Sequence, residues 1–549
     1  MLDRLRKHSA KISALADMGT DLLIETADGG RDALALSQPM WATWTMEQFA
    51  LIPKLCRPFD DPDMLRKRRE ALETFVRLPH LHPSGLSSAA PAFASDASLV
   101  TGASRHFLEN VCEVEVRGWE HAAFLSRILE PLSARYVAFD SNRAWLLYWI
   151  AHSLDLMGMP LTGVKQARAI STLLHFQDTE RGGFGGGPGQ MGHLMSTYAA
   201  ICALAIVGGP GGMPTAHDID RGQSVEVGRG GWDCIEKDKI YAWMLRLKQP
   251  DGSFLVHEQG EIDVRATYCV LVVASLLGLV TEELLDGVGD YLASCQTYEG
   301  GFAAMSCAEY TVHGDAVHPL GAVRDQPAQG EAHGGYAFCA FASHAHLVQL
   351  GRAGCVDTQA LLRWATSLQG MAYEGGGFRG RTNKLVDGCY GWFCGGGLMT
   401  CLEGLLLPPP DETAANDDDG DGSWDSVSDH DEDLYDRRAL QTYILAVAQL
   451  DTGGLCDKPG KRPDAYHTCY NLSGLSMTQH RVRPNPAMAA RAAEACGRTD
   501  VLQRSVYAQS LAWVPSGDAT APSDAVGVTH PVFNVAVRHV ERLMSHCYT

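Results

Sequence analysis

Residues 295–304 read CQTYEGGFAA, and four other segments repeat this pattern of a glutamine, a turn with one or more glycines and a large apolar residue. These segments are QDTERGGFGG from Gln177, KQPDGSF around Gln249, LQGMAYEGGGF around Gln369 and AQLDTGGL around Gln449. Self-similarity with a period of about 20 to 50 residues is the signature of repeat architectures. The repeated turn therefore decides the fold.

The spacing of the glutamines predicts a unit of about 47 residues with three insertions. Successive glutamines are separated by 72, 47, 73 and 80 residues. Each long interval contains a segment that differs from the apolar stretches around it, namely Gly208–Gly231, Ala303–Gln329 or Pro408–Asp436. A unit of this size holds two helices.

Apolar segments within the repeats are expected to be the inner helices, because a helix that is apolar nearly all round is buried. They are Thr197–Val207, Arg265–Leu279, Tyr336–Leu350, Gly397–Leu407 and Leu440–Leu450. The alternation typical of strands is largely absent, so the chain is predicted to be all-α. Helix pairs of this kind form an open solenoid or close into an α/α barrel, and closure would surround a central cavity.

The two ends of the chain differ in character. Residues 1–100 are predicted to be a partly flexible N-terminal extension, with a charged helix at Met64–Thr74 and a Ser/Ala/Pro-rich link at Pro83–Ser98. Residues 101–549 are predicted to be the helical-repeat domain, with the insertions at about 208–231, 303–329 and 408–436.

The formal net charge of −20 disfavours a nucleic-acid partner. Residues 411–436 contain twelve Asp or Glu and no Lys or Arg, so the rest of the chain is only mildly acidic. Within this stretch Asp417, Asp419, Asp421 and Gly422 match a calcium loop, but Ser428 stands where the loop needs Glu. An unstructured acidic loop is the favoured interpretation.

Sixteen cysteines are dispersed without a C-x-x-C pair, which predicts reduced thiols rather than a disulfide framework or a zinc ribbon. The N-terminal residues lack the apolar run of a signal peptide, and the longest apolar stretch, Val270–Val280, is too short to span a bilayer. We therefore predict a cytoplasmic protein without a membrane span.

Residues 380–393, GRTNKLVDGCYGWF, carry the highest density of reactive groups in the sequence. Arg381 and Lys384 would share one face of a helix if a helix began at Gly380, and could then bind an anion together. Asp387 and Cys389 could converge on one cation, and zinc accepts both ligand types. An isolated D-x-C pair is more often a capping Asp beside a buried Cys.

Three further motifs carry polar or aromatic groups. In CDKPGKRPDAYHTCYNLSGLS (456–476), Asp464 is a predicted N-cap that places His467 in the first helical turn, as a candidate third zinc ligand. In EAHGGYAFC (331–339), His333 precedes a helix and could donate to an anion, although a lone His there is more often a cap. Trp145 and Trp149 share one helix face, which is ordinarily core.

Taken together, these motifs resemble the β subunits of protein farnesyltransferases, in the protein prenyltransferase β-subunit family. The resemblance runs from about Glu120 to Val540 and leaves out residues 1–100 and the three insertions. It includes GGFGGGPGQ, LKQPDGSF, GEIDVRATY, EAHGGYAFC, GRTNKLVDGCY, DKPGKRPDAYHTCY, LSGLS and THPVFN. The resemblance implies an α/α barrel, or toroid, that farnesylates proteins.

The resemblance also implies a zinc- and magnesium-dependent reaction. Asp387, Cys389 and His467 would bind one zinc ion, whose open fourth position receives the cysteine thiol of a protein ending in a C-a-a-X box. Asp457 would be the carboxylate associated with Mg²⁺. The residues implied in gripping the diphosphate of farnesyl diphosphate are His333, Arg381, Lys384 and Tyr390.

The walls of the substrate pocket are implied in the same way. Trp145 and Tyr470 would shorten the prenyl pocket, and Tyr268 and Cys339 would line its wall. Trp149 and Tyr466 would line the peptide side, and Arg265 would lie near the carboxylate that ends the peptide. The sequence departs from the family at Gly391-Trp392-Phe393, where the family usually has S-F-W, so chain-length preference is expected to differ in detail.

The implied partners are an α subunit in an obligate heterodimer and C-a-a-X proteins such as small GTPases. Arg381, Lys384 and a protonated His333 supply at most three positive charges to a diphosphate of about −3, which favours a further cation from the α subunit. A geranylgeranyltransferase type I β subunit is disfavoured by Asp457 and Trp145. A terpene cyclase and a non-catalytic α/α scaffold are more distant alternatives.

Overall fold

The computed structural model describes residues 22–25, 31–34, 115–130, 132, 134–214, 230–306, 310–313, 316–319, 328–371, 374–407, 433–515 and 525–549. The charged helix predicted at 64–74, the link predicted at 83–98 and the calcium-like stretch at 417–428 lie outside these residues. Among the described helices, none has the length and hydropathy needed to cross a membrane.

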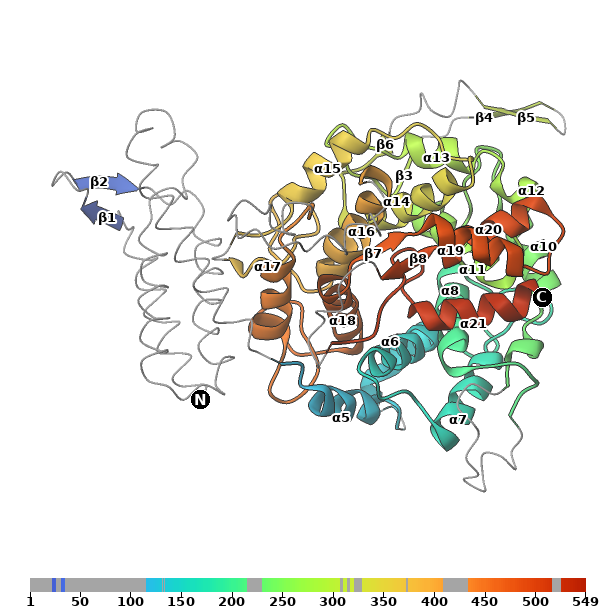
Figure 1. The fold of residues 1–549 in the computed structure, drawn as a ribbon, viewed down its shortest axis with the longest axis horizontal. Coiled ribbons are helices and arrows are strands. Elements are labelled where there is room, and N and C mark those ends of the chain that lie inside the picture. The colour runs from blue at the N-terminus through green and yellow to red at the C-terminus, as the bar shows by residue number, and fades with distance from the viewer. Residues whose placement is uncertain are drawn as a thin grey trace, which may run out of the picture.

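A closed ring of inner helices forms the centre of the molecule (Figure 1). Each member packs against the next, and the last packs against the first. In ring order they are α6 (Arg143–Leu156), α8 (Leu194–Val207), α11 (Val264–Leu277), α14 (Gly334–Gln349), the π-helix η7 (Gly391–Gly396) with α16 (Gly397–Leu406), and α18 (Ala465–Gln479). The ring confirms the predicted α/α barrel and excludes an open solenoid.

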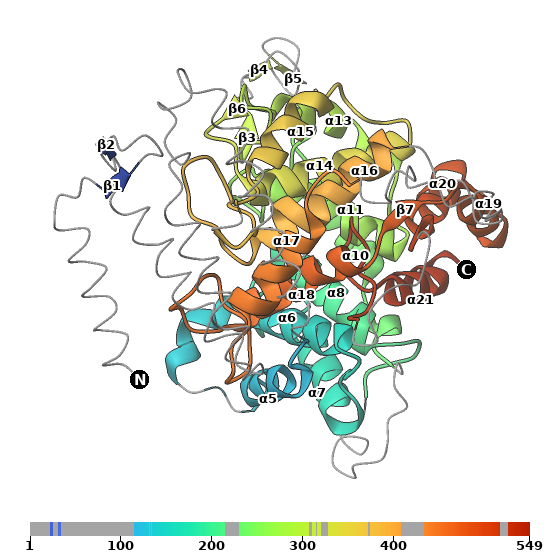
Figure 2. The same cartoon turned by 60° about the vertical axis from the view of Figure 1, so that its left-hand side comes forward.

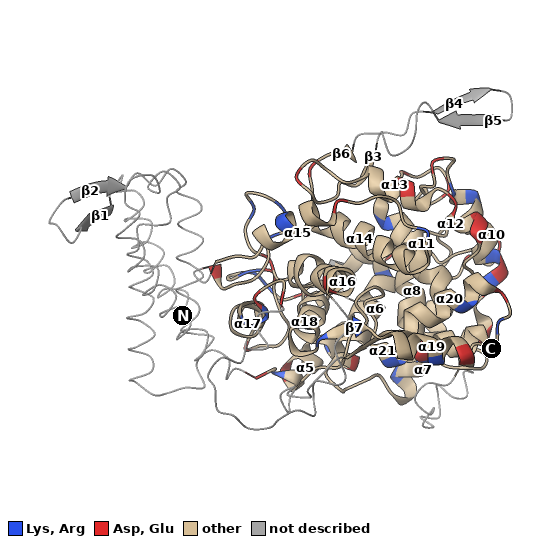
Figure 3. Ribbon diagram, turned by 45° about the horizontal axis from the view of Figure 1, so that its top comes forward, with Lys and Arg blue, Asp and Glu red and all other residues tan. Residues whose placement is uncertain are grey.

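A second layer of helices surrounds this ring, and each outer helix contacts the inner helix that follows it in the chain. The outer helices are α5 (Gly118–Ile128), α7 (Gly163–Leu174), α10 (Lys237–Leu247), α13 (Val288–Ser294), α15 (Thr358–Ser367), and α17 (Arg437–Thr442) with its π-helical continuation η9 (Tyr443–Ala448). Figure 3 shows charged residues mainly on the periphery, whereas the central helices are largely uncharged.

One expected inner helix is an outer one. The segment 440–450 forms η9 and the end of α17, which pack on α18 outside the ring. Its uniform burial has another cause, because Leu440 packs against Gly391 and Gly395 on one side while Tyr443 packs against the glycine-rich turn at Gly377 on the other. An apolar helix surface therefore did not identify the layer to which this segment belongs.

The remaining helices lie at the ends and edges of the barrel. They are η3 (Ala134–Asn142), η4 (Trp232–Cys234), α12 (Glu282–Leu285), α19 (Pro486–Ala495), α20 (Val501–Leu511) and α21 (Val537–Tyr548). The last of these packs on α8, α11 and α20. Figure 2 shows α19 and α20 projecting beside the C-terminus.

Four short antiparallel strand pairs complete the described elements. They are β1 (Leu22–Glu25) with β2 (Arg31–Leu34), β3 (Met305–Ser306) with β6 (Ala328–Gln329), β4 (Tyr310–His313) with β5 (Ala316–Pro319), and β7 (Val482–Pro484) with β8 (Trp513–Pro515). Their registers place Leu23 opposite Ala33, Met305 opposite Gln329, Val312 opposite Val317, and Arg483 opposite Val514.

Two of the predicted insertions leave and re-enter the barrel at one place. A backbone bridge joins Gly209 to Gly231, and β3 pairs with β6 at the two ends of the 303–329 segment. Because the two ends of each insertion lie close together, the insertion does not displace the helices before and after it. The domain boundaries themselves remain predictions.

A loop near the C-terminus lies across the interior of the ring. Three tyrosines on consecutive inner helices donate hydrogen bonds to three consecutive carbonyls of this loop. Tyr148 donates to Asn534 (2.6 Å), Tyr198 to Phe533 (3.0 Å) and Tyr268 to Val532 (2.8 Å). These bonds satisfy hydroxyls that are buried in an otherwise aromatic interior.

Four of the five repeated glutamines join one repeat to the next, and Gln249 is the exception. The side chain of Gln296 accepts a hydrogen bond from the backbone N of Asp357 and donates to its carbonyl, both at 2.9 Å, just before α15. Gln369 makes the same pair of bonds to Asp436 before α17. Gln177 similarly binds the backbone of Glu236 and Cys234 before α10.

The last glutamine closes the ring. Gln449 is buried, accepts from the backbone N of Arg117 at 2.9 Å and donates to the carbonyl of Glu115 at 3.1 Å. These residues precede α5, so the bonds connect the last turn to the first helix pair. His121 Nε2 also lies 2.8 Å from the side-chain oxygen Oε1 of Gln449.

Replacing Gln449 with Leu should therefore destabilise the chain. The change leaves two partly buried backbone groups and the buried imidazole of His121 without these partners, which should lower the free energy of unfolding by about 2 to 4 kcal/mol. The matched control is Gln249→Leu, because the Gln249 amide donates to Leu247 within its own turn and Lys248 makes the bonds to the next repeat. Equal losses for the two variants in urea unfolding would contradict a closing function of Gln449.

Candidate active site

A cavity of about 380 Å³ lies within the ring of inner helices. Nine residues that the sequence analysis assigned to the site line it: Trp145, Trp149, Arg265, Tyr268, His333, Cys339, Tyr390, Tyr466 and Tyr470. The other lining residues are Asn142, Met195, Tyr198, Cys269, Gly335, Tyr336, Phe338, Trp392, Phe393 and Asn534. The structure thus brings together residues that are more than 300 positions apart in the chain.

Aromatic rings make up most of the cavity wall. Phe393 packs on Tyr470 with ring centroids 4.5 Å apart, and Tyr466 lies edge-on to Trp149 at 5.4 Å. The Trp145 ring contacts Trp149, Tyr148 and Tyr198 at 5.6 to 5.8 Å. Such a wall suits a long apolar ligand with few polar groups.

Tyr198 and Phe338 are cavity residues that the sequence analysis did not assign. Inner helices α8, α11 and α14 begin after the N-caps His193, Asp263 and His333, whose side chains each accept a backbone N–H. Tyr198, Tyr268 and Phe338 each lie five residues after one of these caps. If the repeats are aligned on their N-caps, Tyr198 and Phe338 occupy the same position as Tyr268. This alignment would therefore have predicted that both residues line the cavity.

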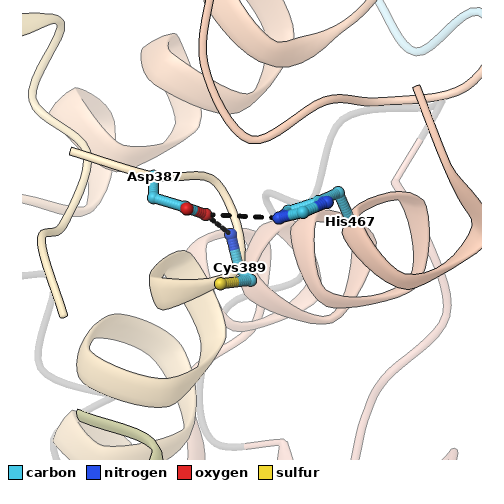
Figure 4. A group of neighbouring side chains, drawn as sticks. All are labelled: Asp387, Cys389 and His467. Atoms are coloured by element: carbon cyan, nitrogen blue, oxygen red, sulfur yellow. Dashed lines mark hydrogen bonds and ion pairs between the residues drawn. The ribbon is translucent and has the colours of Figure 1, made fainter. Parts of the chain in front are cut away.

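Beside the cavity, Asp387, Cys389 and His467 form a group whose ligand atoms all lie within 4.8 Å of one another. Asp387 Oδ1 accepts a hydrogen bond from the backbone N of Cys389 at 3.1 Å and lies 3.5 Å from His467 Nε2. Figure 4 shows the carboxylate pointing toward the imidazole ring. One carboxylate, one thiol and one imidazole are donors that fit zinc, and three protein ligands are typical of a catalytic site.

Close backbone packing brings the two segments of this group together. A side chain at Gly388 would collide with the amide of Asn471 on α18, its added Cβ lying 2.4 Å from that nitrogen. The backbone N of Gly388 donates to the carbonyl of Asp457 at 2.7 Å. On α18, Asp464 caps the helix by accepting from the backbone N of His467 and also contacts its Nδ1 at 2.8 Å.

Two members of the group, Cys389 and His467, hold their protons strongly when no metal is bound. Burial raises the pKa of the Cys389 thiol to about 12. Burial lowers the pKa of His467, but hydrogen bonds with Asp387 and Asp464 outweigh it and raise the pKa well above the usual value. Burial also acts to raise the pKa of Asp387, yet His467 and Lys458 hold it well below its usual range. Cys389 and His467 would lose protons on binding a metal ion.

His333 and Tyr390 form a pair of donors at the cavity. His333 Nε2 lies 3.1 Å from the Tyr390 hydroxyl, and Nδ1 accepts from the backbone N of Gly335. Burial and then the charge of Arg265 lower the pKa of His333, and Nδ1 needs a free lone pair to accept from Gly335, so both observations favour the neutral imidazole over the protonated state counted above. Since Nδ1 accepts, Nε2 carries the proton and donates to Tyr390, whose own O–H is left to donate to a ligand.

The two predicted cations are not on a helix. The segment from Gly380 to Gly388 is an irregular loop, and Arg381 forms an ion pair with Glu331 while Lys384 is exposed. An added Cβ at Gly380 would lie 2.1 Å from the Tyr390 ring, so the loop has to pass directly against that side chain. Neither cation lines the cavity.

Arg265 lies at the cavity with its charge already matched. Asp263 accepts from Arg265 Nε at 2.9 Å and from one terminal nitrogen at 2.7 Å. The guanidinium lies over the ring of Tyr336, 5.4 Å from its centroid. The side chain is 42% exposed, so it can still bind a carboxylate through its remaining N–H groups.

Asp457 lies next to the metal-binding group but outside the cavity lining. Its carbonyl accepts from Gly388 N and from the Tyr443 hydroxyl, which fixes the backbone. Its carboxylate is paired with Lys458, a residue that the sequence analysis did not assign. The only hint of Lys458 in the sequence was its position directly after Asp457.

Comparison with known proteins gives consistent matches. The model of the prenyltransferase alpha-alpha toroid domain family matches residues 117–535. The protein farnesyltransferase subunit beta of Pisum sativum is 36% identical over 383 residues, 63% of this chain and 80% of that protein. The corresponding protein of Schizosaccharomyces pombe is 35% identical over 365 residues, covering 66% of this chain and 78% of its own length.

A solved structure shares the fold. The structure described as Candida albicans protein geranylgeranyltransferase-I complexed with GGPP aligns with a TM-score of 0.52 and 17% sequence identity. The alignment covers 79% of this chain and 100% of that chain. At this identity the match concerns the arrangement of helices alone.

Replacing Cys389 with Ala should remove most of the bound metal, because the group loses one of its three protein donors. We expect the variant to retain less than about a tenth of the wild-type content by elemental mass spectrometry after dialysis. The control is Cys394→Ala, which removes a buried thiol outside the group. Wild-type metal content in Cys389→Ala would contradict the assignment.

Proposed function

This chain belongs to the farnesyltransferase β subunits of the prenyltransferase alpha-alpha toroid family, and we propose that it transfers the farnesyl group of farnesyl diphosphate to the cysteine thiolate of C-a-a-X proteins. The new bond joins the thiolate sulfur to C1 of the farnesyl chain, and pyrophosphate leaves. The observation that carries the proposal is the position of the Asp387, Cys389 and His467 group beside the aromatic cavity. This arrangement supports a thiol-binding metal site next to a pocket for an apolar chain.

Zinc is the metal that we assign to this group. When bound, it would lower the pKa of a thiol ligand so that a thiolate forms near neutral pH. Asp387, Cys389 and His467 would hold it and leave a fourth position for the substrate thiol. The Asp464 carboxylate, 2.8 Å from His467 Nδ1, would orient the imidazole from behind.

Residues around the cavity would bind the two ends of the prenyl donor. We assign the apolar chain to the aromatic wall, with Trp145 and Tyr470 limiting its length and Tyr268 and Cys339 lining its side. The Tyr390 hydroxyl, oriented by His333, would donate to the diphosphate and stabilise charge that grows on the leaving group. Arg381 and Lys384 would add positive charge at the rim.

The peptide would lie on the other side of the cavity. We assign Trp149 and Tyr466 to its apolar side chains, because the two rings pack together and both line the cavity. Arg265 would bind the terminal carboxylate through N–H groups that Asp263 does not use.

Magnesium is assigned to Asp457. Mg²⁺ is commonly bound by one or two carboxylates together with substrate phosphates, and Asp457 is a half-buried carboxylate beside the metal-binding group. The fit is incomplete in one respect, since Lys458 already pairs with this carboxylate.

An α subunit is part of the proposed enzyme. The neutral His333 and the paired Arg381 leave the diphosphate short of positive charge on this chain, so a cation from a partner would complete the site. The proposed location is cytoplasmic, in keeping with thirteen free cysteines among the described residues.

A geranylgeranyltransferase type I β subunit is the nearest alternative in substrate. It is disfavoured because the relatives at 35 and 36% identity are farnesyltransferase subunits and because the bulky Trp145, which lines the cavity, is proposed to limit the length of the prenyl chain. A terpene cyclase or a scaffold would have no use for the Asp387, Cys389 and His467 group.

Transfer assays on the chain co-expressed with an α subunit test the function. We expect a C-a-a-X peptide to be labelled from the C15 diphosphate, and the isolated chain to be inactive because its own cations are too few. Full activity of the isolated chain would contradict the heterodimer. A preference for the C20 diphosphate would favour the geranylgeranyltransferase.

Replacing Trp145 with Thr should raise the use of the C20 donor relative to C15, because one more isoprene unit needs the volume that the indole fills. A change of at least tenfold in the ratio of kcat/KM values is expected. Trp149→Thr is the matched control, since it removes an indole one helical turn away on the peptide side. An unchanged ratio in Trp145→Thr would place the end wall elsewhere, for example at Trp392 and Phe393.

A further inference from the structure

Lys458 lies between two carboxylates that the proposed reaction assigns to different metal ions. Its Nζ is paired with Asp457 Oδ2 and lies 3.5 Å from Asp387 Oδ2. The other oxygen of Asp387 faces His467 and the backbone N of Cys389. The two oxygens of Asp387 are thus divided between the zinc-binding group and Lys458.

Neighbouring residues enclose the Lys458 ammonium and fix the backbone of Lys458. The side chains of Lys458, Asp457 and Asp387 are 17, 18 and 20% exposed, so the charges are largely shielded from water. The Cys456 thiol and the backbone N of Lys461 both donate to the Lys458 carbonyl at 3.2 Å. Charges enclosed in this way interact more strongly than an exposed surface pair.

We propose that Lys458 competes with the divalent cation for the carboxylate of Asp457 and thereby sets the magnesium concentration that the enzyme needs. This inference rests on the proposed function. An ammonium and Mg²⁺ cannot occupy the same side of one carboxylate, and their like charges repel. Magnesium that binds Asp457 Oδ2 would therefore have to displace Lys458.

Asp387 makes this displacement feasible. Its Oδ2 is 3.5 Å from the same Nζ, so the displaced ammonium keeps a carboxylate partner instead of being left buried and unpaired. In moving toward Asp387, Lys458 would also support the outer oxygen of a zinc ligand. It acts as a positioning residue, because it works through the two carboxylates.

Manganese binding to the heterodimer tests the proposal directly. Mn²⁺ replaces Mg²⁺ as a probe that electron paramagnetic resonance detects, and an unreactive analogue of farnesyl diphosphate occupies the cavity. We expect Lys458→Met and Lys458→Gln each to lower the Kd for Mn²⁺ about tenfold. Zinc content, measured on the same samples, should stay at the wild-type level.

Lys461→Met is the matched control, because it removes a positive charge from the same loop at an exposed position. Its Kd should remain within about twofold of the wild-type value. Asp457→Asn should weaken Mn²⁺ binding at least tenfold, and adding Lys458→Met to it should then change nothing further.

The possible outcomes distinguish a failure of the proposed competition by Lys458 from a failure of the magnesium assignment to Asp457. Wild-type Mn²⁺ affinity in both Lys458 variants, with weakened binding in Asp457→Asn, would overturn the competition and leave the magnesium site intact. Zinc loss from the Lys458 variants without a change in Mn²⁺ affinity would mean that Lys458 only supports the zinc-binding group. That result would also overturn the proposed competition. Unchanged Mn²⁺ binding in Asp457→Asn would remove the magnesium assignment itself.

Discussion

The hydrogen bonds of Gln449 to the backbone before α5 are the contact on which the closed barrel depends. A closed ring of helix pairs has no terminal repeat, so the last repeat has to contact the first in the way that other repeats contact their successors. Gln449 does this with the same donor and acceptor that Gln296 and Gln369 use between consecutive repeats. Only a closed ring brings α18 beside α6, and hence Tyr466 beside Trp149 at the cavity.

The same contacts explain which parts of the fold were predictable. A glutamine turn that recurs along the chain is a local signal, so the repeated helix pairs followed from it, whereas closure into a barrel was implied only by the resemblance to a family. The layer of the 440–450 segment did not follow, because its burial comes from glycines at positions 377, 391 and 395 in other repeats. The apolar composition of a helix predicts that it is buried, but it does not predict which elements pack against it.

The site divides in a similar way. Asp387, Cys389 and His467 were candidates because of their motifs, whereas the nine cavity residues were implied by the resemblance to a family, and the structure brings both sets together. Tyr198 and Phe338 were missed, since an aromatic residue on an apolar helix has no distinctive signal until the helices are aligned by their N-caps. The neutral state of His333 and the pairing of Arg381 with Glu331 depend on burial and on contacts across the loop, which no motif encodes.

These two corrections change the electrostatics of the proposed reaction. A diphosphate that leaves with growing negative charge needs cations or donors aimed at it, yet Arg381 is partly neutralised by Glu331 and His333 carries no charge. Tyr390 accepts a hydrogen bond from His333 and can therefore donate its own O–H to the diphosphate. Lys384 is exposed and can supply a positive charge. Stabilisation from this subunit is therefore mainly dipolar. The proposed dependence on magnesium and on a partner's cation would follow from that shortage, and the proposed competition by Lys458 would adjust the magnesium requirement.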